Sequence, residues 1–538
     1  MPTLQKIPLE LPLPSLRDNT ATMDRLAKAL RPRLGAWPQA PLGRLAGFAR
    51  VIQAARGGLL TATVAESPAG PVVVEVTPGD AAAAAPGPGL AARAREIPAE
   101  PWGREGLGLA LDVGSTHLQA SLHELPAGRE LARGTVLNPQ HQVGADILTR
   151  IHAAAEPAGL ARLQGLVLGA AGELAQDLAA RAGRRAAEIT ALVAAGNTTM
   201  SHLFLGLDVA GICREPYIPL VNRIPPFFTR ELGLAWADDA VGWLLPNVGS
   251  YFGGDLVAGI VAAGLHQREG LAILVDVGTN AEVVLGNRDW LLACAGAAGP
   301  ALEGGVARRG VLAQPGAISR VRLDPADLTP RLEIIPAPDG SPARPLGLCG
   351  SGLLDLLAQL YLTGAIDPRG RLTLAPGHPR RVESEEAPAF LVAPGAESAD
   401  GRDIVVDEIE IDILLRSKAA MYTILRTATL EVGVEFADLE AFYVAGAFGN
   451  VIDPDTAVTL GMLPDLPRER FIPLGNSSLA GCQKLLLEPD SRPQATAVAD
   501  RLTYLELNVN QALMNRFSAA RFIPHTDTAR FPSVPARH

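Results

Sequence analysis

The chain has 538 residues, of which 48% are hydrophobic and 19% charged, and its net charge is −10. This composition supplies apolar side chains for several buried cores and excludes a disordered or collagen-like chain. The acidic balance argues against nucleic acid as a partner, because nucleic-acid-binding proteins usually carry a basic face. No lysine stands in a G-x-x-x-x-G-K-[ST] loop, which excludes a P-loop phosphate site.

The chain lacks the patterns of secreted and membrane proteins. Its first ten residues show no basic and apolar regions typical of a signal peptide, and the apolar run Leu256–Leu265 is far shorter than the ~20 residues of a membrane span. The four cysteines are widely separated, without a C-x-x-C pair, which favours a reducing compartment and argues against a clustered iron–sulfur site. We therefore expect a cytoplasmic protein that does not associate with a membrane.

The N-terminal part of the chain predicts a linker and a small domain. Residues 1–30 contain spaced prolines and end in a helical pattern over Thr20–Leu30, so we expect an extended linker leading into a helix. Residues 31–105 contain a helical stretch and two strand-like runs, Leu59–Val64 and Pro71–Val76. This content is typical of a small α+β domain.

The main body, residues 106–538, contains an internal duplication. Gly108–Thr116 and Ala272–Asn280 each read as a buried strand, a D-x-G turn and a returning strand of period two. Two copies of one hairpin, each followed by alternating helix and strand patterns, predict an α/β fold with two similar lobes around a cleft. We place the lobes at about 106–265 and 266–538.

The repeated turn is suited to binding a metal-bound phosphate. A carboxylate at a strand end can hold Mg²⁺, and the glycine lets the backbone turn its N–H groups toward an anion. A single D-x-G turn is more often a plain hairpin, but two copies in the same context favour a phosphate site. The candidate residues are Asp112, Gly114, Ser115 and Thr116 in the first copy, and Asp276, Gly278, Thr279 and Asn280 in the second.

Further glycine-led segments precede predicted helices. Ala441–Ala445 reads as a strand, and Gly446, Gly449 and Asn450 after it would let an adenosine approach the backbone. Asp255, at the start of the helix Leu256–Leu265, either caps that helix or orients an attacking water or the metal.

Two other segments have simpler interpretations. The polar turn Gly475–Gly481 is most simply a helix cap. Leu353–Leu362 and Ile411–Val432 are predicted as helices of the later half.

Together these motifs resemble the superfamily of acetate kinase, sugar kinases, heat-shock chaperones and actin, the ASKHA fold. The resemblance implies two RNase H-like lobes with ATP and Mg²⁺ between them. It implies that Asp112 and Asp276 are the carboxylates for the metal and the phosphates, and that Asp255 belongs to the catalytic group.

Within this superfamily the chain resembles the reductive activators of corrinoid proteins. The resemblance rests on eight segments that keep the family's order, namely Asn138–Leu148, Gly196–Met200, Pro246–Asp255, Gly299–Gly305, Leu348–Gly352, Ala445–Asn450, Gly475–Gly481 and Phe522–Thr526. Such activators are ATPases that drive reduction of a Co(II) corrinoid to Co(I) in methyltransferase systems. The resemblance adds Gly350 and Gly352 to the nucleotide contacts and implies a corrinoid protein as partner. It also identifies residues 1–30 and 31–105 with the family's linker and middle domain. It also points to a homodimer, for which the chain shows no heptad repeat.

The chain departs from the family pattern at two places. Family members carry an N-terminal [2Fe–2S] domain, whereas this sequence begins where that domain would have ended; we expect no iron–sulfur cluster here and electrons from a separate low-potential ferredoxin or flavoprotein. Where the family often reads Cys-Ser-Ala-Ser-Ala-Gly-Pro, this chain has Ala295 and Ala297 in place of the serines. Those hydroxyls are suited to approach the cobalt.

Three functions follow as hypotheses. The first is an ATP-dependent activator of a corrinoid protein. The second is a small-molecule kinase of the same superfamily, and the third is a non-catalytic module that binds a corrinoid protein and senses nucleotide. Stimulation of ATP consumption by a protein, by a metabolite or by neither distinguishes them.

Overall fold

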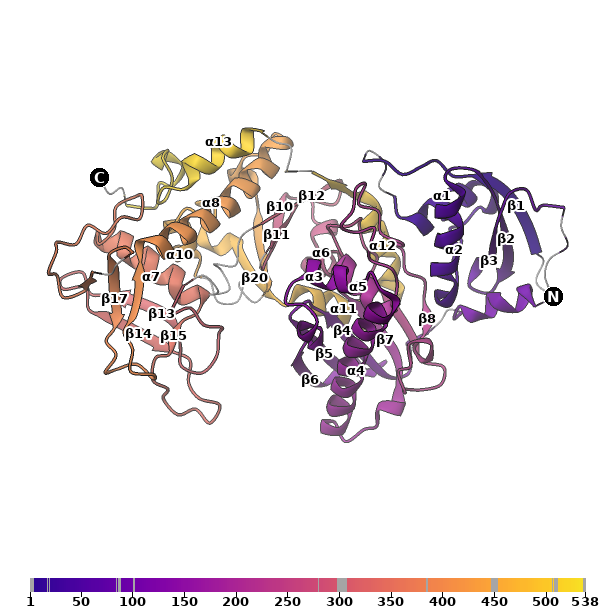
Figure 1. Cartoon of the computed structure of the whole chain (residues 1–538), viewed down its shortest axis with the longest axis horizontal. Coiled ribbons are helices and arrows are strands. Elements are labelled where there is room, and N and C mark those ends of the chain that lie inside the picture. Colours follow the sequence, from indigo (N-terminus) through magenta and orange to yellow (C-terminus); the bar gives the residue numbers. More distant parts are fainter. Residues whose placement is uncertain are drawn as a thin grey trace. The chain divides into compact units, whose positions relative to one another are not determined.

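The computed structural model describes residues 4–16, 18, 20–83, 85, 89–99, 102–278, 280–297, 307–383, 386–446, 453–505, 507 and 511–535. The chain divides into two compact units. The first comprises Met1–Ala262 and Ser477–Arg501, and the second comprises Ala263–Asn476 and Leu502–His538. Figure 1 labels the elements of both units.

The N-terminal domain of the first unit is a three-stranded sheet with two helices. The strands β1 (Leu4–Glu10), β2 (Leu59–Ser67) and β3 (Gly70–Pro78) lie in the order β1-β2-β3, and both pairs are antiparallel. The helices are α1 (Thr22–Leu34) and α2 (Leu42–Ala55). Figure 1 shows both helices beside this sheet.

The start of the chain differs from the linker expected over residues 1–30. Residues Leu4–Glu10 instead form strand β1, which pairs with β2 along its whole length, and the side chains of Ile7 and Leu9 in β1 are buried. Pro8, which suggested an extended linker, is tolerated because β1 is an edge strand and an edge strand can omit one donor. The predicted helix is α1, which begins two residues later and ends at Gly35 in the left-handed conformation.

The first unit continues with a six-stranded sheet of order β6-β5-β4-β7-β9-β8. β4, β5 and β6 form an antiparallel meander, and β7 and β9 run parallel to β4. The strands are β4 (Gly106–Val113), β5 (His117–Leu125), β6 (Arg129–Leu137), β7 (Ile189–Ala195), β8 (Phe227–Phe228) and β9 (Val241–Leu244). The helices are α3 (Ile147–Ala153), α4 (Pro157–Arg181), α5 (Thr198–Leu205), α6 (Gly254–Ala263), α11 (Ser477–Leu487) and α12 (Arg492–Arg501).

The second unit repeats this arrangement in a sheet of order β20-β19-β10-β11-β12-β21. β10, β11 and β12 form the antiparallel meander, and β19 and β20 continue in parallel beside β10. The strands are β10 (Ala272–Val277), β11 (Asn280–Gly286), β12 (Leu291–Ala297), β19 (Ala441–Ala445), β20 (Phe471–Gly475) and β21 (Leu502–Tyr504). The shared strand order confirms the predicted α/β class with a duplicated lobe.

Among the described residues, the second unit also contains two three-stranded sheets, β14-β13-β15 and β16-β17-β18, and four α-helices. The strands are β13 (Ala317–Leu323), β14 (Pro330–Ile334), β15 (Gly347–Leu348), β16 (Arg381–Val382), β17 (Ala389–Ala393) and β18 (Ile404–Asp407). The helices are α7 (Gly350–Thr363), α8 (Glu408–Glu431), α10 (Pro454–Thr459) and α13 (Gln511–Ala520). Within the described ranges, no helix is long and apolar enough to cross a membrane.

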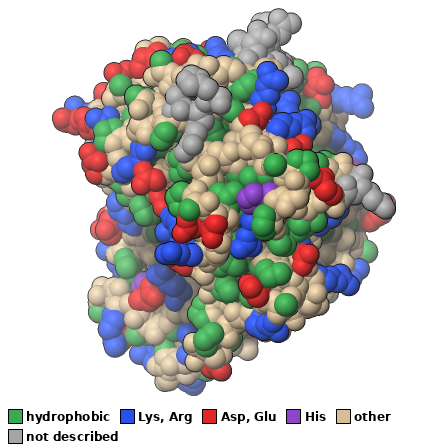
Figure 2. Space-filling view, turned by 90° about the vertical axis from the view of Figure 1, so that its left-hand side faces the viewer, with side chains coloured by type: hydrophobic (Ala, Val, Ile, Leu, Met, Phe, Trp, Pro, Cys, Tyr) green, Lys and Arg blue, Asp and Glu red, His purple; other side chains and the backbone are tan. Residues whose placement is uncertain are grey.

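The molecular face drawn in Figure 2 carries acidic and basic side chains interspersed with one another. Exposed ion pairs of the second unit, such as Arg288 with Glu269 and Arg320 with Glu333, have this mixed character. Exposed pairs of this kind contribute little to stability, at about 0–1 kcal/mol each.

The segment Ser477–Arg501 belongs to the first unit, although the sequence analysis assigned all of 266–538 to the second lobe. The reason is that α11 packs against strands β4 and β7 of the first sheet, and it also approaches helix α6 closely. A Cβ atom at Gly481 would lie 2.2 Å from the Ala258 carbonyl oxygen, so only glycine allows this approach. Such packing between helices far apart in sequence leaves no local pattern.

Candidate functional site

Asp112 lies near the carboxyl end of β4, in the centre of the first sheet. Its neighbour on the parallel strand β7 is Ala195, the last residue of that strand. The Ser478 hydroxyl, at the start of α11, donates a hydrogen bond to Asp112 Oδ1 at 2.8 Å. The Asp112 carboxylate is half-buried, and the helix that holds it lies more than 300 residues later in the chain.

The turn after Asp112 is fixed by hydrogen bonds to its carbonyl groups. Asn138 donates from its side chain to the Gly114 oxygen at 2.9 Å and from its backbone to the Thr116 oxygen at 2.8 Å. Arg150, which is 1% exposed, donates to the Ser115 oxygen at 2.8 Å. A Cβ atom at Gly114 would lie 2.4 Å from the His117 oxygen, so the turn requires glycine.

Asp255 lies in the first turn of α6, beside the end of β7. Its backbone N–H donates to the Gly196 oxygen at 3.3 Å, and its side chain accepts from the Leu256 N–H at 2.8 Å. The neighbouring Gly254 N–H donates to Asn247 Oδ1 at 3.1 Å. A Cβ atom at Gly253 would lie 2.2 Å from Asn197 Cα. Glycine at the helix start therefore brings Asp255 against the end of β7.

Backbone contacts bring Asp112 and Asp255 to one edge of the first sheet. Asp112 is paired with Ala195, and the Asp255 N–H donates to the oxygen of the next residue, Gly196. The nearby Cys482 thiol is buried in α11 and donates to the Leu111 oxygen at 3.6 Å. Burial, followed by the negative charges of Asp112 and Asp255, raises the pKa of this thiol well above its usual value, so it is neutral and unsuited to act as a nucleophile.

Asp276 occupies the corresponding place in the second unit. It lies in β10 opposite Ala445, the last residue of the parallel strand β19. Gly446 follows with a φ of +83°, and a Cβ atom there would lie 2.7 Å from Asp276 Oδ1. The Gly278 N–H donates to the Asn280 oxygen at 2.9 Å and closes the turn. Glycine at position 446 therefore leaves the Asp276 carboxylate room.

Other predicted residues of the second unit are placed differently or lie outside the described residues. Gly350 and Gly352 begin helix α7, and a Cβ atom at Gly352 would lie 2.2 Å from the Ile318 oxygen of β13. This contact gives Gly352 a packing role, and its contact with nucleotide stays a prediction. Thr279, Gly449 and Asn450 lie outside the described residues.

The carboxylates suit a metal that is bound together with phosphates. Within the described ranges, no group of three or more His, Cys, Asp or Glu side chains could hold a metal by itself. Mg²⁺ in nucleotide sites typically takes one or two carboxylates and fills its other positions with phosphate oxygens and water. Asp112 and Asp276 are carboxylates of the type that Mg²⁺ takes, and their binding of the metal stays a prediction.

Comparisons with known proteins match most of the chain. The family described as "RACo middle region" matches residues 107–268, and the "C-terminal domain of RACo the ASKHA domain" matches residues 270–535. The solved structure of a "Reductive activator for corrinoid,iron-sulfur protein" is 34% identical, covers 99% of this chain and 81% of its own, and has a TM-score of 0.71. This chain belongs to the family of reductive activators of corrinoid proteins.

Two curated relatives agree with this assignment. "Corrinoid activation enzyme RamQ" from Eubacterium limosum is 29% identical over 408 residues, which is 74% of this chain and 67% of that protein. "[Co(II) methylated amine-specific corrinoid protein] reductase" from Methanosarcina barkeri is 25% identical over 280 residues, or 48% of this chain and 46% of that protein. The family assignment and the ASKHA fold expected from the sequence are confirmed.

The two alanines that depart from the family pattern lie on the strand next to the Asp276–Asn280 turn. In the β11–β12 pairing, Ala295 is opposite Glu282 and Ala297 is opposite Asn280. Asn280 is the last residue of the predicted Asp276–Asn280 turn. In this activator the lost hydroxyls therefore map to the strand next to that turn.

The sequence analysis gave no role to several residues that support the first turn. Asn138 lies in a segment that was recognised only by family resemblance, Ser478 lies in a polar turn that was expected only to cap its helix, and Arg150 was not singled out. Gly196 occupies the place in the first unit that Gly446 has in the second, because each follows the residue paired with an aspartate. The sequence signal for Gly196 is the internal repeat. If the two copies are aligned past the hairpin as far as the next parallel strand, Gly196 falls opposite Gly446.

Proposed function

We propose that this protein is an ATPase that supports the reduction of a corrinoid protein from Co(II) to Co(I). One electron passes from a separate low-potential donor, a ferredoxin or flavoprotein, to the cobalt, while ATP and water give ADP and phosphate. The observation that carries the proposal is the convergence of Asp112, Asp255 and Ser478 at the ends of β4 and β7 in a chain of this family.

The described residues have chemistry that suits this reaction. Asp112 and Asp276 would hold Mg²⁺, and the backbone turns Gly114–Thr116 and Gly278–Asn280 would bind phosphate oxygens. Bound Mg²⁺ would neutralise charge that develops on the phosphates. Asp255 would orient the attacking water, because phosphoryl transfer depends mainly on position and electrostatics.

Nucleotide specificity is proposed for the glycine-led segments. Gly446 brings its backbone against Asp276 without a side chain, and together with Gly449 and Asn450 it would face the adenosine. The Ser478 hydroxyl fixes the Asp112 carboxylate, which would bind the metal or its water.

ATP has a thermodynamic role in such a system. A one-electron transfer that is uphill by about 60 mV is unfavourable by about tenfold. A protein that binds one oxidation state more tightly shifts this equilibrium, and nucleotide binding and hydrolysis can then reset the complex.

The direct test mixes the protein with a Co(II) corrinoid protein, Mg-ATP and a low-potential reductant. We expect Co(I) absorbance to appear only with ATP, and to be lost in Asp112→Asn. Co(I) formation that does not depend on ATP, across several corrinoid proteins of methyltransferase systems, would contradict the proposal.

A small-molecule kinase is the second candidate, and the alanines at positions 295 and 297 favour it, because the hydroxyls associated with cobalt chemistry are missing there. It predicts that a metabolite, and not a corrinoid protein, stimulates ATP consumption. A metabolite screen without stimulation would exclude it.

The place of action is proposed from the thiols. All four cysteines are free, and Cys294, Cys349 and Cys482 are buried. Free thiols in a chain of this length are typical of a reducing compartment, so we propose the cytoplasm. A homodimer is proposed from the family pattern, and sedimentation of the full chain tests it.

A further inference from the structure

Asp255 is placed by the loop of residues 247–253, which leads directly into helix α6. The loop ends at Gly253, where a Cβ atom would lie 2.2 Å from Asn197 Cα, so its chain passes against the start of α5 without room for a side chain. Because α6 begins where this loop ends, the conformation of the loop sets the position of Asp255 relative to the end of β7.

Thr198, the first residue of α5, holds this loop through its side chain. Its hydroxyl donates to the Gly249 oxygen at 2.7 Å and also reaches the Phe252 oxygen at 3.1 Å. The Thr198 side chain is 1% exposed, so these contacts are shielded from solvent. One hydroxyl therefore joins the start of α5 to two carbonyl groups of the loop before Asp255.

Two asparagines hold further points of the same loop. Asn222 Oδ1 accepts from the Gly249 N–H at 3.3 Å. Asn247 Oδ1 accepts from the Gly254 N–H at 3.1 Å, one residue before Asp255, and Asn247 is 2% exposed. The first N–H groups of a helix have no acceptor within the helix, so this buried amide satisfies one of them for α6.

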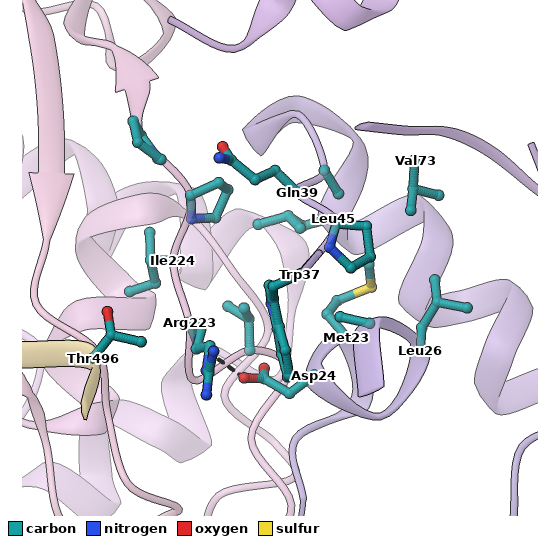
Figure 3. Close-up of a pocket in the computed structure, with 16 residues that line it drawn as sticks. Met23, Asp24, Leu26, Trp37, Gln39, Leu45, Val73, Arg223, Ile224 and Thr496 are labelled. Carbon is teal, nitrogen blue, oxygen red and sulfur yellow. Dashed lines mark hydrogen bonds between the residues drawn. The ribbon is translucent and has the colours of Figure 1, made fainter. Parts of the chain in front are cut away.

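The loop is also linked to the N-terminal domain through Asn222. Its N–H donates to Asp24 Oδ2 of α1 at 2.7 Å, and its oxygen accepts from the Asn247 N–H at 3.0 Å. Asp24 is 6% exposed and accepts from the Arg223 N–H at 3.1 Å as well, and the close-up in Figure 3 shows this bond. A series of hydrogen bonds therefore runs from α1 to the residue before Asp255.

We propose that Thr198 is a positioning residue for Asp255, because its hydroxyl fixes the loop that keeps this carboxylate where it orients the attacking water. The inference rests on the proposed function, in which Asp255 acts on water during ATP hydrolysis. The two acceptors of the hydroxyl belong to the loop and not to the turns at Asp112 and Asp276. Loss of the hydroxyl should therefore slow hydrolysis and leave the affinity for Mg-ATP unchanged.

The test compares two variants of the full chain. Thr198→Val removes the hydroxyl and keeps the shape of the side chain, and it should lower kcat for ATP hydrolysis by about ten- to a hundredfold, because a small misplacement of a reacting group is costly. The Kd for Mg-ATP, measured by calorimetry, should stay within about twofold of wild type. Thr198→Ser keeps the hydroxyl and should restore most of kcat.

A double-mutant cycle separates positioning from a general structural effect. Asp255→Asn alone should lower kcat, and adding Thr198→Val should cost less than about a further twofold, because the group that Thr198 positions is already lost. Thr61→Val is the matched control, since Thr61 is also buried and donates to the Gly79 oxygen at 2.8 Å in the N-terminal domain. This control should leave kcat unchanged in both backgrounds.

Circular dichroism must show that Thr198→Val is folded. If it is not, Asn222→Ala decides, because this half-buried asparagine holds the same loop and its loss should lower kcat about threefold with the same dependence on Asp255. Absence of ATP hydrolysis by wild type would overturn the proposed function and this inference together. Hydrolysis that the decisive variant leaves unchanged, or lowers by the same factor in the Asp255→Asn background, would overturn this inference alone.

Discussion

The two aspartate turns share one backbone arrangement, seen from different contacts in the two units. In both units a glycine follows the residue paired with the aspartate, and a Cβ atom there would lie 2.7 Å from the Val113 oxygen at Gly196 and 2.8 Å from the Val277 oxygen at Gly446. The Asp112 turn is held by side chains from distant elements, Asn138, Arg150 and Ser478. The Asp276 turn has its own backbone bond and the close approach of Gly446 to the carboxylate among its contacts.

The comparison shows what a duplicated hairpin keeps. The strand, the turn and the adjacent glycine recur in both units, and this backbone shape suits the phosphate binding proposed for each turn. Side chains from separate parts of the chain support the first turn, and a close approach of glycine accompanies the second. We therefore expect the first turn to be sensitive to distant side chains and the second to glycine replacement.

The largest effect is expected from removing either carboxylate charge. Asp112→Asn and Asp276→Asn should each lower kcat/KM for ATP hydrolysis by about 10²–10³-fold, the range for losing one preorganised electrostatic contact in a transition state. Steady-state phosphate release measures this. Asp238→Asn and Asp289→Asn, at exposed acids of the two units, serve as controls and should leave the rate unchanged. If only one of the two aspartates mattered, the proposed equivalence would be wrong.

Replacing Gly446 tests whether the second turn depends on the close approach of this glycine to Asp276. Gly446→Ala should destabilise the second unit by about 1–3 kcal/mol and weaken nucleotide binding, because alanine disfavours a φ of +83° and its Cβ would meet the Asp276 carboxylate. Gly433→Ala is the matched control, since it has a φ of +69° with no atom within 4 Å of a Cβ. Urea unfolding and calorimetry give the two readouts. Equal nucleotide affinity in the two variants would contradict the contact with Asp276.

Acid should destabilise the first unit through a histidine near its turn. Burial lowers the pKa of His202 to about 4, and its ring contacts the Thr198 oxygen at 2.7 Å. Between about pH 6.5 and 4 the unfolded chain binds a proton that the folded chain does not, so up to about 3 kcal/mol of stability is lost as pH falls. His202→Gln should lose less stability between pH 7 and 5 in urea unfolding. If His202→Gln lost as much stability as wild type between pH 7 and 5, His202 would not be the group responsible.

The second unit contains a comparable group. Burial, followed by the charges of Arg530 and Lys418, lowers the pKa of His525 to about 4. We therefore expect His525 to make the second unit less stable as pH falls between about 6.5 and 4. His525→Gln should reduce this loss in urea unfolding and leave the loss that arises from His202 unchanged.

The smallest effect is expected from the hydroxyl that holds Asp112. Ser478→Ala removes one hydrogen bond, so ATP hydrolysis should fall about fivefold, in line with about 1 kcal/mol for such a bond. Ser491→Ala removes a hydroxyl that bonds Glu488 in the same unit and should have no effect on the rate. A Ser478→Ala rate equal to wild type would show that Asp112 is held by other contacts.

The sequence predicted those features that depend on local pattern. Alternating apolar residues and the D-x-G turns located β4, β5, β10 and β11, and periodicity located α6, α7 and α8 within a few residues. Helix α8 was expected to begin at Ile411, but it begins at Glu408 because Asp407 caps it and accepts from the Ile409 and Glu410 N–H groups.

Features that depend on distant packing were not predictable. The prolines near the start hid the edge strand β1, which pairs with residues of β2 that lie 49 to 61 positions later in the chain. The Ser478–Asp112 bond joins residues 366 positions apart, and the polar turn before α11 was expected only to cap its helix. The local sequence pattern of a helix does not indicate which sheet the helix will contact.

The most direct measurement is titration of the full chain and of two variants with Mg-ATP by calorimetry. If the Asp112 and Asp276 turns serve one nucleotide, wild type binds one Mg-ATP per chain and either Asp→Asn change removes that same event. Two independent binding events, each lost with a different aspartate, or no heat of binding at all, would contradict the account.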